Sequence, residues 1–251
     1  MKVVDINCDM GESFGAYKIG SDDEMMKHIT SANIACGYHA GDPMVMDRTV
    51  KMAAESGVNV GAHPGYPDLM GFGRRVMYLS PEEIENYTLY QIGALWSFCK
   101  AHKTDMRHVK PHGAISNLSW TDEGVGRALA RGIARFSREL PVFSIPGVPM
   151  ATAAEELGLR VIHEVYPERG YNADGTLQSR KMPGSSIHDP KVAVDRALKM
   201  VREGIVIAWT GEAVKVSAQT ICIHGDNPVA PQIASALTSA LKAEGVEIKP
   251  I

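Results

Sequence analysis

Short apolar runs alternate along the chain with longer segments in which apolar residues recur every three or four positions. This alternation is typical of βαβ units, in which strands form a parallel sheet and helices cover it. Seven strands are predicted, beginning near Val3, Ala32, Val58, Met106, Pro141, Arg160 and Thr220. A chain of 251 residues also has the length usual for a closed α/β barrel, so we expect that fold.

Helix starts are marked by residues that can cap a first turn. The segments 21–24 and 80–83 both read Ser-x-x-Glu, the pattern of a capping box. The pairs Asp189–Pro190 and Asn227–Pro228 likewise precede apolar residues at helical spacing. Four helices are therefore expected to begin at these points.

Two further apolar runs, at 205–208 and 213–216, flank Thr210 and Gly211. Turn residues between two such runs predict a β-hairpin over residues 205–216. No linker or low-complexity segment interrupts the chain. We therefore expect one barrel domain over residues 1–251, with the hairpin as a small insertion.

The strands carry polar residues on one face. Because successive side chains of a strand point to opposite faces, Asp5, Asn7 and Asp9 share a face. The next three predicted strands give similar faces, which contain Asn33 and His39, then Asn59 and His63, then His108, Lys110 and His112. Barrel interiors are normally filled by Val, Ile and Leu, so this repetition indicates a polar cavity that serves a site. Any one of these groups could instead simply satisfy its neighbours.

Polar loops follow five of the strands, where barrel enzymes place their catalytic groups. The candidate catalytic residues in these loops are Asp9, His39, His63, His112 and His224. Histidine and carboxylate side chains suit either general acid–base chemistry or a divalent metal. A metal site would combine Asp9, His39, His63 and His224. No HExxH or other local ligand spacing is present, however, so no metal is assigned and the question stays open.

Arginines mark candidate anion sites. The loop Gly71–Arg75 could hold a carboxylate or phosphate through Arg74 and Arg75, or it could be a solvated turn. Glu168, Arg169 and Arg180 present the same two alternatives.

Composition and charge exclude several classes. The formal net charge is −3 and no run is rich in Lys or Arg, so no nucleic-acid partner is expected. Neither a signal peptide nor a membrane span is predicted, which favours a cytoplasmic protein with no membrane partner. The four cysteines show no CxxC pair and are assigned no chemistry. No GxxxxGK[ST] loop, GxGxxG or GxSxG is present, which disfavours a stand-alone P-loop ATPase and a serine hydrolase.

Six motifs, in this order along the chain, resemble the LamB/YcsF family. They are Asp5–Glu12, Ala32–Pro43, Gly61–Asp68, Gly71–Arg75, Val109–Ala114 and Ile223–Asp226. Two places depart from the family pattern. Ile115-Ser116-Asn117 stands where Leu-Tyr-Asn is usual, and Glu168 stands where Asp is expected. The departures suggest an altered substrate contact near these positions.

The resemblance implies an irregular seven-stranded β/α barrel related to carbohydrate deacetylases. It also implies ATP-dependent opening of the 5-oxo-L-proline lactam to L-glutamate, together with two other subunits of a 5-oxoprolinase. The residues that would bind substrate or phosphate are Asn7, Glu12, Asp42, Arg74, Arg75, Lys110, Asn117, Glu168, Arg169 and Asp226. ATP would be consumed as a co-substrate and bound mainly by the partner subunits. A homo-oligomer is left open.

The preferred hypothesis is that phosphorylation of the lactam oxygen makes the carbonyl carbon open to attack by water. Asp9 or His63 would be the general base, and His39, His112 or His224 would steady the oxyanion or protonate the ring nitrogen. Two alternatives are kept. One is a metal-dependent deacetylase or amidohydrolase that acts without ATP. The other is a protein that binds a small molecule without catalysis.

Overall fold

The computed structural model describes residues 2–225, 227 and 229–251. Within them, seven parallel strands close into a barrel in the order β1-β2-β3-β4-β5-β6-β9, and β9 pairs back onto β1. The barrel strands are β1 (Val3–Met10), β2 (Ser31–Ala35), β3 (Asn59–His63), β4 (Met106–Val109), β5 (Val142–Ser144), β6 (Val161–Val165) and β9 (Thr220–Ile223). The predicted irregular seven-stranded β/α barrel is confirmed.

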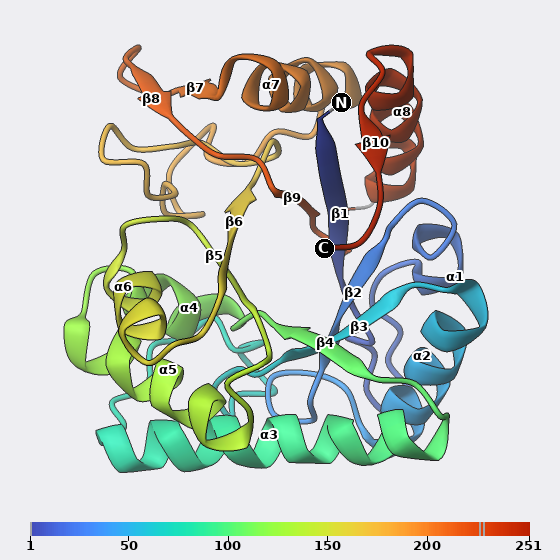
Figure 1. The fold of residues 1–251 in the computed structure, drawn as a ribbon, viewed down its shortest axis with the longest axis vertical. Coiled ribbons are helices and arrows are strands. Elements are labelled where there is room, and N and C mark those ends of the chain that lie inside the picture. Colours follow the sequence, from blue (N-terminus) through green and yellow to red (C-terminus); the bar gives the residue numbers. More distant parts are fainter. Residues whose placement is uncertain (1, 226, 228) are drawn as a thin grey trace.

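Eight helices lie around the strands of the described chain (Figure 1). They are α1 (Asp22–Met25), α2 (Pro43–Ser56), α3 (Pro81–Ala101), α4 (Gly113–Ser119), α5 (Glu123–Phe136), α6 (Pro149–Glu156), α7 (Pro190–Glu203) and α8 (Ala230–Ala243). The strand β10 (Glu247–Ile248) pairs with the start of β1. Strands β7 (Ile205–Ile207) and β8 (Ala213–Lys215) form an antiparallel hairpin near α7.

Three of the four helix starts follow the predicted signals, at α1, α3 and α7, and side chains cap the helix in the last two. At α3 the capping box is complete, since Ser80 accepts from the Glu83 N–H and the Glu83 side chain accepts from the Ser80 N–H. Asp189 caps α7 through its carboxylate.

The capping box predicted at Ser21 was wrong. The Ser21 side chain makes no cap hydrogen bond because α1 lasts only one turn and Glu24 is turned toward Lys27, 2.7 Å away. The last helix begins at Ala230 with Val229 at its N-cap, later than expected. Pro228, which was expected to open it, lies outside the described residues.

The core lies between the strands and the helices. Val4, Ile6, Cys8 and Met10 of β1 are fully buried in it. The alternate residues Asp5, Asn7 and Asp9 are also buried, but their side chains bond to polar groups of other barrel strands. The alternation predicted from β1 is therefore confirmed, and the barrel interior is polar.

Candidate active site

The interior of the barrel is filled by side chains that bond to one another. At its amino end, the fully buried Asp5 carboxylate accepts from Ser31 at 2.7 Å, Thr30 at 2.6 Å and Thr220. Burial raises the pKa of Asp5, although these hydroxyl donors act against the rise. This layer is structural, because all its polar groups satisfy one another.

The next layer joins two asparagines and a histidine. Asn33 donates to the Asn7 oxygen at 2.7 Å, and His108 Nε2 lies 2.7 Å from the Asn33 oxygen. Gly61 makes room for His108, because a Cβ atom at position 61 would lie 2.0 Å from its Nε2. Burial, followed by the positive charge of Lys110, lowers the pKa of His108 to about 3, so the ring is neutral and donates to Asn33.

Lys110, just after β4, ties three strands together. Its ammonium lies 2.9 Å from Asp9, 3.0 Å from Glu164 and 2.9 Å from the Cys222 sulfur. Burial alone would lower the pKa of Lys110, but Asp9, and then Cys222 and Glu164, raise it well above its usual value. An ammonium has three N–H donors, so Lys110 has none left for a substrate. These contacts favour a role for Lys110 in positioning Asp9, and the expectation that it binds substrate or phosphate stays a prediction.

Asp9 stands between this lysine and a group of histidines. Its second oxygen lies 3.4 Å from His63 Nε2. Burial alone would raise the pKa of Asp9, but His63 and Lys110 hold it well below its usual value. The Asp9 carboxylate therefore lies between two cation-forming groups, Lys110 and His63, and can orient both.

Four more candidate residues meet beside Asp9. His63 Nε2 lies 3.0 Å from His112 Nδ1, and the rings of His39 and His112 stack with centroids 3.7 Å apart. Glu12 Oε1 lies 3.8 Å from both His39 Nε2 and His112 Nδ1. Burial first, and neighbouring positive charge second, lower the pKa values of His39 and His112 well below the ordinary value. We call Glu12, His39, His63 and His112 the histidine cluster.

A small pocket of about 140 Å³ opens beside this interior. Its lining consists of Glu168, Arg169, Arg180, Ser186, Ile187, His188, His224 and Asn227. Glu168 accepts from the His224 backbone N–H at 2.9 Å, and His224 Nδ1 lies 3.5 Å from the same carboxylate. The other side of His224 faces the interior, since a ring nitrogen lies within 4.8 Å of both an Asp9 oxygen and the Cys222 sulfur. Burial lowers the pKa of His224, which Glu168 partly offsets.

The loop Gly71–Arg75 lies over the histidine cluster. The Phe72 carbonyl accepts from His112 Nε2 at 2.8 Å, and the Phe72 ring packs edge-on against His39 and His112. Arg74 lies over the Phe72 ring, 5.0 Å from its centroid. Arg75 pairs with Asp68, so the structure uses this guanidinium to brace the loop.

Other predicted residues lie in structural roles or outside the site. Asp42 caps α2 by accepting from the Met44 and Val45 N–H groups. Arg169 lines the small pocket, but its guanidinium donates to backbone carbonyls of Gln178 and Ser185. Asn117 is exposed on α4. Asp226 lies outside the described residues.

Glu164 and Cys222 are among the interior residues that were missed. Glu164 lies in β6 and bonds to Lys110, Asn7 and the Tyr166 hydroxyl. A carboxylate inside a short buried strand was the signal that could have revealed it. Cys222 was assigned no chemistry, yet its sulfur contacts the Lys110 ammonium.

The metal site considered from the sequence is divided by the structure. Asp9, His39, His63 and His224 do not form one ligand group. His39 and His63 belong to the histidine cluster, whereas Asp9 and His224 approach Cys222. Sequence spacing could not show this division, because it depends on how the loops fold over the barrel.

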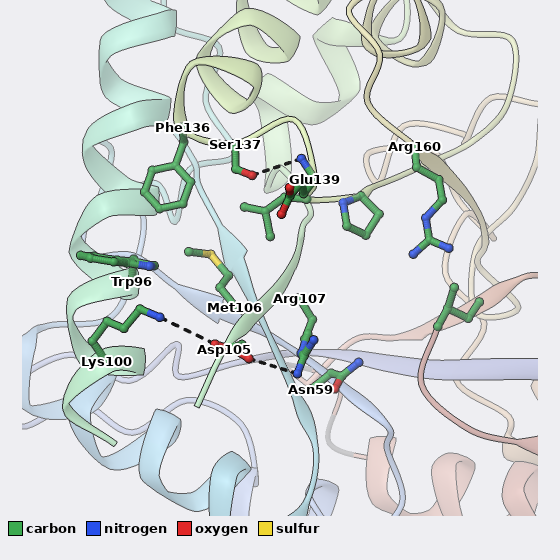
Figure 2. A pocket seen from close by; sticks show the side chains of 13 residues that line it. Asn59, Trp96, Lys100, Asp105, Met106, Arg107, Phe136, Ser137, Glu139 and Arg160 are labelled. Carbon is green, nitrogen blue, oxygen red and sulfur yellow. Dashed lines mark hydrogen bonds and ion pairs between the residues drawn. The ribbon is translucent and has the colours of Figure 1, made fainter. Parts of the chain in front are cut away.

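A much larger cleft, of about 900 Å³, lies at the opposite end of the barrel (Figure 2). Its walls include Asn59 and Met106, the first residues of β3 and β4, and Arg160, which precedes β6. Figure 2 shows Lys100 and Arg107 turned toward Asp105, with nitrogen–oxygen distances of 3.7 and 3.2 Å. This cleft contains no histidine among its described lining residues and lies at the amino ends of the strands. Despite its size, it is therefore a weaker candidate for catalysis than the buried groups at the carboxyl ends.

No helix among the described residues combines the length and the apolar character that a membrane crossing requires.

Comparison with known proteins agrees with this fold. A model of the LamB/YcsF family matches residues 4–251. A protein of Pyrococcus abyssi that is named as a subunit of 5-oxoprolinase is 54% identical over 248 residues, which cover 99% of this chain and 97% of that protein. The crystal structure of a lactam utilization protein from Thermus thermophilus is 48% identical, covers all of both chains and superposes with a TM-score of 0.95.

More distant structures share the fold alone. The polysaccharide deacetylase Bc1974 from Bacillus cereus superposes with a TM-score of 0.50 at 12% identity, covering 100% of this chain and 92% of that one. At this identity the likeness concerns the arrangement of strands and helices, and it supports the deacetylase-like barrel expected from the sequence.

Proposed function

The chain belongs to the LamB/YcsF family, and from that premise we propose that it opens the lactam ring of 5-oxo-L-proline to give L-glutamate. We further propose that it acts as one subunit of a 5-oxoprolinase that consumes ATP. The names of its relatives support the substrate, and the word "subunit" in those names supports the assembly. The observation that carries the proposal is a small pocket bounded by Arg180 and His224, whose inner wall adjoins the buried Asp9.

The reaction needs activation because an amide carbonyl resists attack by water. Transfer of the γ-phosphoryl group of ATP to the lactam oxygen releases ADP and makes the ring carbon electrophilic. A first water adds to that carbon, the carbon–nitrogen bond breaks as the nitrogen takes a proton, and an acyl phosphate of glutamate remains. A second water hydrolyses this acyl phosphate, and phosphate leaves. The products are glutamate, ADP and phosphate. Because the chain has no GxxxxGK[ST] loop, we propose that two partner subunits bind most of the nucleotide.

The small pocket suits a small anionic substrate. Arg180 lies on its wall beside the buried Arg169, whose pKa is lowered to about 10 by burial and by the charge of Arg180. Because Arg169 is bound to backbone carbonyls, Arg180 is the better partner for the substrate carboxylate. His224 lines the same pocket and stays neutral near pH 7, so it can exchange a proton with the attacking water or the ring nitrogen.

Reconstitution tests this function. The chain alone, the partner subunits alone and the assembled complex are each incubated with 5-oxoproline, with and without ATP, and glutamate and ADP are measured. We expect glutamate and ADP in equal amounts from the complex with ATP, and little of either from the chain alone. Full-rate turnover by the chain alone would contradict the need for partners.

Two variants test the pocket within the assembled complex. Arg180→Ala should raise KM for 5-oxoproline at least about tenfold, because the carboxylate loses its charged partner. His224→Gln should lower kcat about 100-fold with a smaller change in KM, the usual size of a general acid–base contribution. Arg160→Ala, at the amino end of the barrel, is the matched control and should leave both constants unchanged. Equal effects of Arg160→Ala and Arg180→Ala would contradict the assignment.

A second function is favoured by the histidine cluster and the deacetylase-like fold. A hydrolase that acts on a related amide without ATP would show amide hydrolysis by the chain alone that nucleotide does not change. The same reconstitution therefore separates the two functions.

A further inference from the structure

The histidine cluster gathers four ligand atoms from four consecutive strands. Glu12, His39, His63 and His112 follow or end β1, β2, β3 and β4. One atom from each lies within 4.8 Å of every other, and all four side chains are buried. Carboxylate and imidazole groups are the usual ligands of zinc and similar metals.

Backbone carbonyls set the tautomers of two of these histidines. His63 Nδ1 lies 2.6 Å from the Lys110 carbonyl, and His112 Nε2 lies 2.8 Å from the Phe72 carbonyl. A carbonyl can only accept, so each of these nitrogens carries its hydrogen. The ring nitrogens left to face a ligand are therefore His63 Nε2 and His112 Nδ1, and these two atoms lie 3.0 Å apart.

Without a proton between them these two nitrogens would repel each other, whereas a metal cation can be bound by both at once. Metal-binding histidines typically donate their other N–H to a backbone carbonyl or carboxylate, which is the arrangement of both rings here. We propose that Glu12, His39, His63 and His112 form a binding site for one divalent transition-metal ion, with Zn²⁺ as the ion that fits the ligand set. This site is independent of the proposed function, since it is defined without substrate or partners.

The distances match a tetrahedral zinc site. Zinc bonds of about 2.0–2.1 Å place neighbouring tetrahedral ligands about 3.4 Å apart. The separations of His63 Nε2 from His112 Nδ1 and of Glu12 Oε1 from His112 Nδ1 and from His39 Nε2 are 3.0, 3.8 and 3.8 Å. They bracket the expected value and the other ligand atoms lie within 4.8 Å, but His39 must tilt out of its parallel stack on His112 before all four can bind one ion.

His39 gives the independent sign of a ligand site. Its ring is fully buried, yet within the described part of the chain neither ring nitrogen has a hydrogen-bond partner. Buried polar groups are rarely left unpaired, and an unexplained case points to an ion or water. Tilting His39 out of its stack on His112 aims a nitrogen at the ion and breaks no hydrogen bond. The backbone at Gly65 and Gly73 closes around the ring, since a Cβ atom at either position would lie 2.7 Å from the His39 side chain.

The neighbouring group of Asp9, Cys222 and His224 is a poorer site. The Lys110 ammonium already occupies the Asp9 oxygen and the Cys222 sulfur, and a second cation there would be repelled. Burial also raises the pKa of Cys222 well above its usual value, so its sulfur stays a thiol instead of the thiolate that binds metal.

Direct metal binding tests the proposal. The full-length chain is dialysed against a chelator and then titrated with ZnSO₄ by calorimetry, and zinc that survives gel filtration is measured by elemental analysis. We expect one zinc per chain. X-ray absorption at the zinc edge should show a nitrogen and oxygen shell with imidazole scattering and no sulfur.

Single changes separate this site from its neighbours. His63→Gln, His112→Gln and Glu12→Gln should each weaken zinc binding at least about tenfold. His102→Gln is the matched control, because His102 pairs with Asp47 outside the cluster, and it should bind zinc like the wild type. Circular dichroism shows whether each variant is folded. If a variant does not fold, the titration of the wild-type chain still tests the proposal.

Two results would overturn the proposal. One is a wild-type chain that takes up no stoichiometric zinc, which would leave a proton shared between His63 and His112 as the explanation of their contact. The other is zinc binding that persists unchanged in folded His63→Gln and His112→Gln chains, or a zinc shell that contains sulfur. Neither result depends on catalysis, so these measurements test the metal site without testing the proposed function.

Discussion

The two ends of the barrel differ in size and in chemistry. The amino end has an open cleft of about 900 Å³, whose charged residues include Asp105 paired with Lys100 and Arg107. The carboxyl end has a pocket of about 140 Å³ beside buried carboxylates, a buried lysine and three buried histidines. Burying charged groups costs free energy, and clusters of such groups are typical of functional sites. The small pocket at the carboxyl end is therefore the stronger candidate for function. Cavity volume alone would have favoured the amino end.

Removing the buried lysine should give the largest effect. Lys110→Met leaves Asp9 and Glu164 buried without their cation, which should lower the free energy of unfolding by about 3–5 kcal/mol. Arg107→Met at the amino end should change it by no more than about 0.5 kcal/mol, because Arg107 is a surface residue. Urea unfolding measures both. Similar losses in the two variants would remove the contrast between the ends.

Filling the space at Gly61 should have a moderate effect. Gly61→Ala places a methyl group against His108, which should cost about 1–3 kcal/mol of unfolding free energy through overpacking. Gly93→Ala on α3 meets no atom within 4 Å and should stabilise the chain by about 0.5–1 kcal/mol. Thermal unfolding compares the pair. An unchanged melting temperature in Gly61→Ala would show that the interior can accommodate the extra methyl group, which would contradict tight packing around His108.

The pH dependence of stability should reveal Asp5. Its pKa is raised in the folded chain, mainly by burial, so the folded state favours the protonated form. Its contribution to stability is complete below the ordinary value of 3.8 and is lost as pH rises through the raised pKa. The wild type should therefore lose more stability than Asp5→Asn as pH rises from about 4 toward neutrality. Urea unfolding at several pH values tests this, and a constant difference between the two proteins would contradict it.

The smallest effect is expected at the cleft itself. A Lys100→Ala, Arg107→Ala and Arg160→Ala triple variant should retain glutamate formation in the reconstituted complex within about twofold, because surface substitutions away from a site are close to neutral. Initial rates measure this. A large loss of turnover in a folded and assembled triple variant would move the site to the amino end.

The sequence predicted the barrel because its signals are local. Strand alternation at Asp5, Asn7 and Asp9 follows from the period of two, and it placed these side chains inside correctly. The capping box at Ser80 is equally local. The similar pattern at Ser21 failed because Glu24 had a better partner in Lys27, and sequence alone does not rank such competitors.

The site was predicted only in part because its contacts are long-range. His39 and His112 were both candidates, but their stacking depends on the loop through Phe72 and Gly73, which adopts positive φ angles. The pairing of Arg75 with Asp68 could not be foreseen for the same reason. Glu164 was missed because a single carboxylate in one strand does not by itself indicate a site. Its importance follows from its ion pair with Lys110, which lies far away in the sequence.

Glutamate formation by an Asp9→Asn complex is the most direct test of the carboxyl-end site. The change is nearly isosteric but removes the charge that joins Lys110 to His63. With folding and assembly verified, we expect turnover of 5-oxoproline to fall at least about 100-fold, while the triple variant of the amino-end cleft stays near the wild-type rate. Full activity of the Asp9→Asn complex would contradict the account.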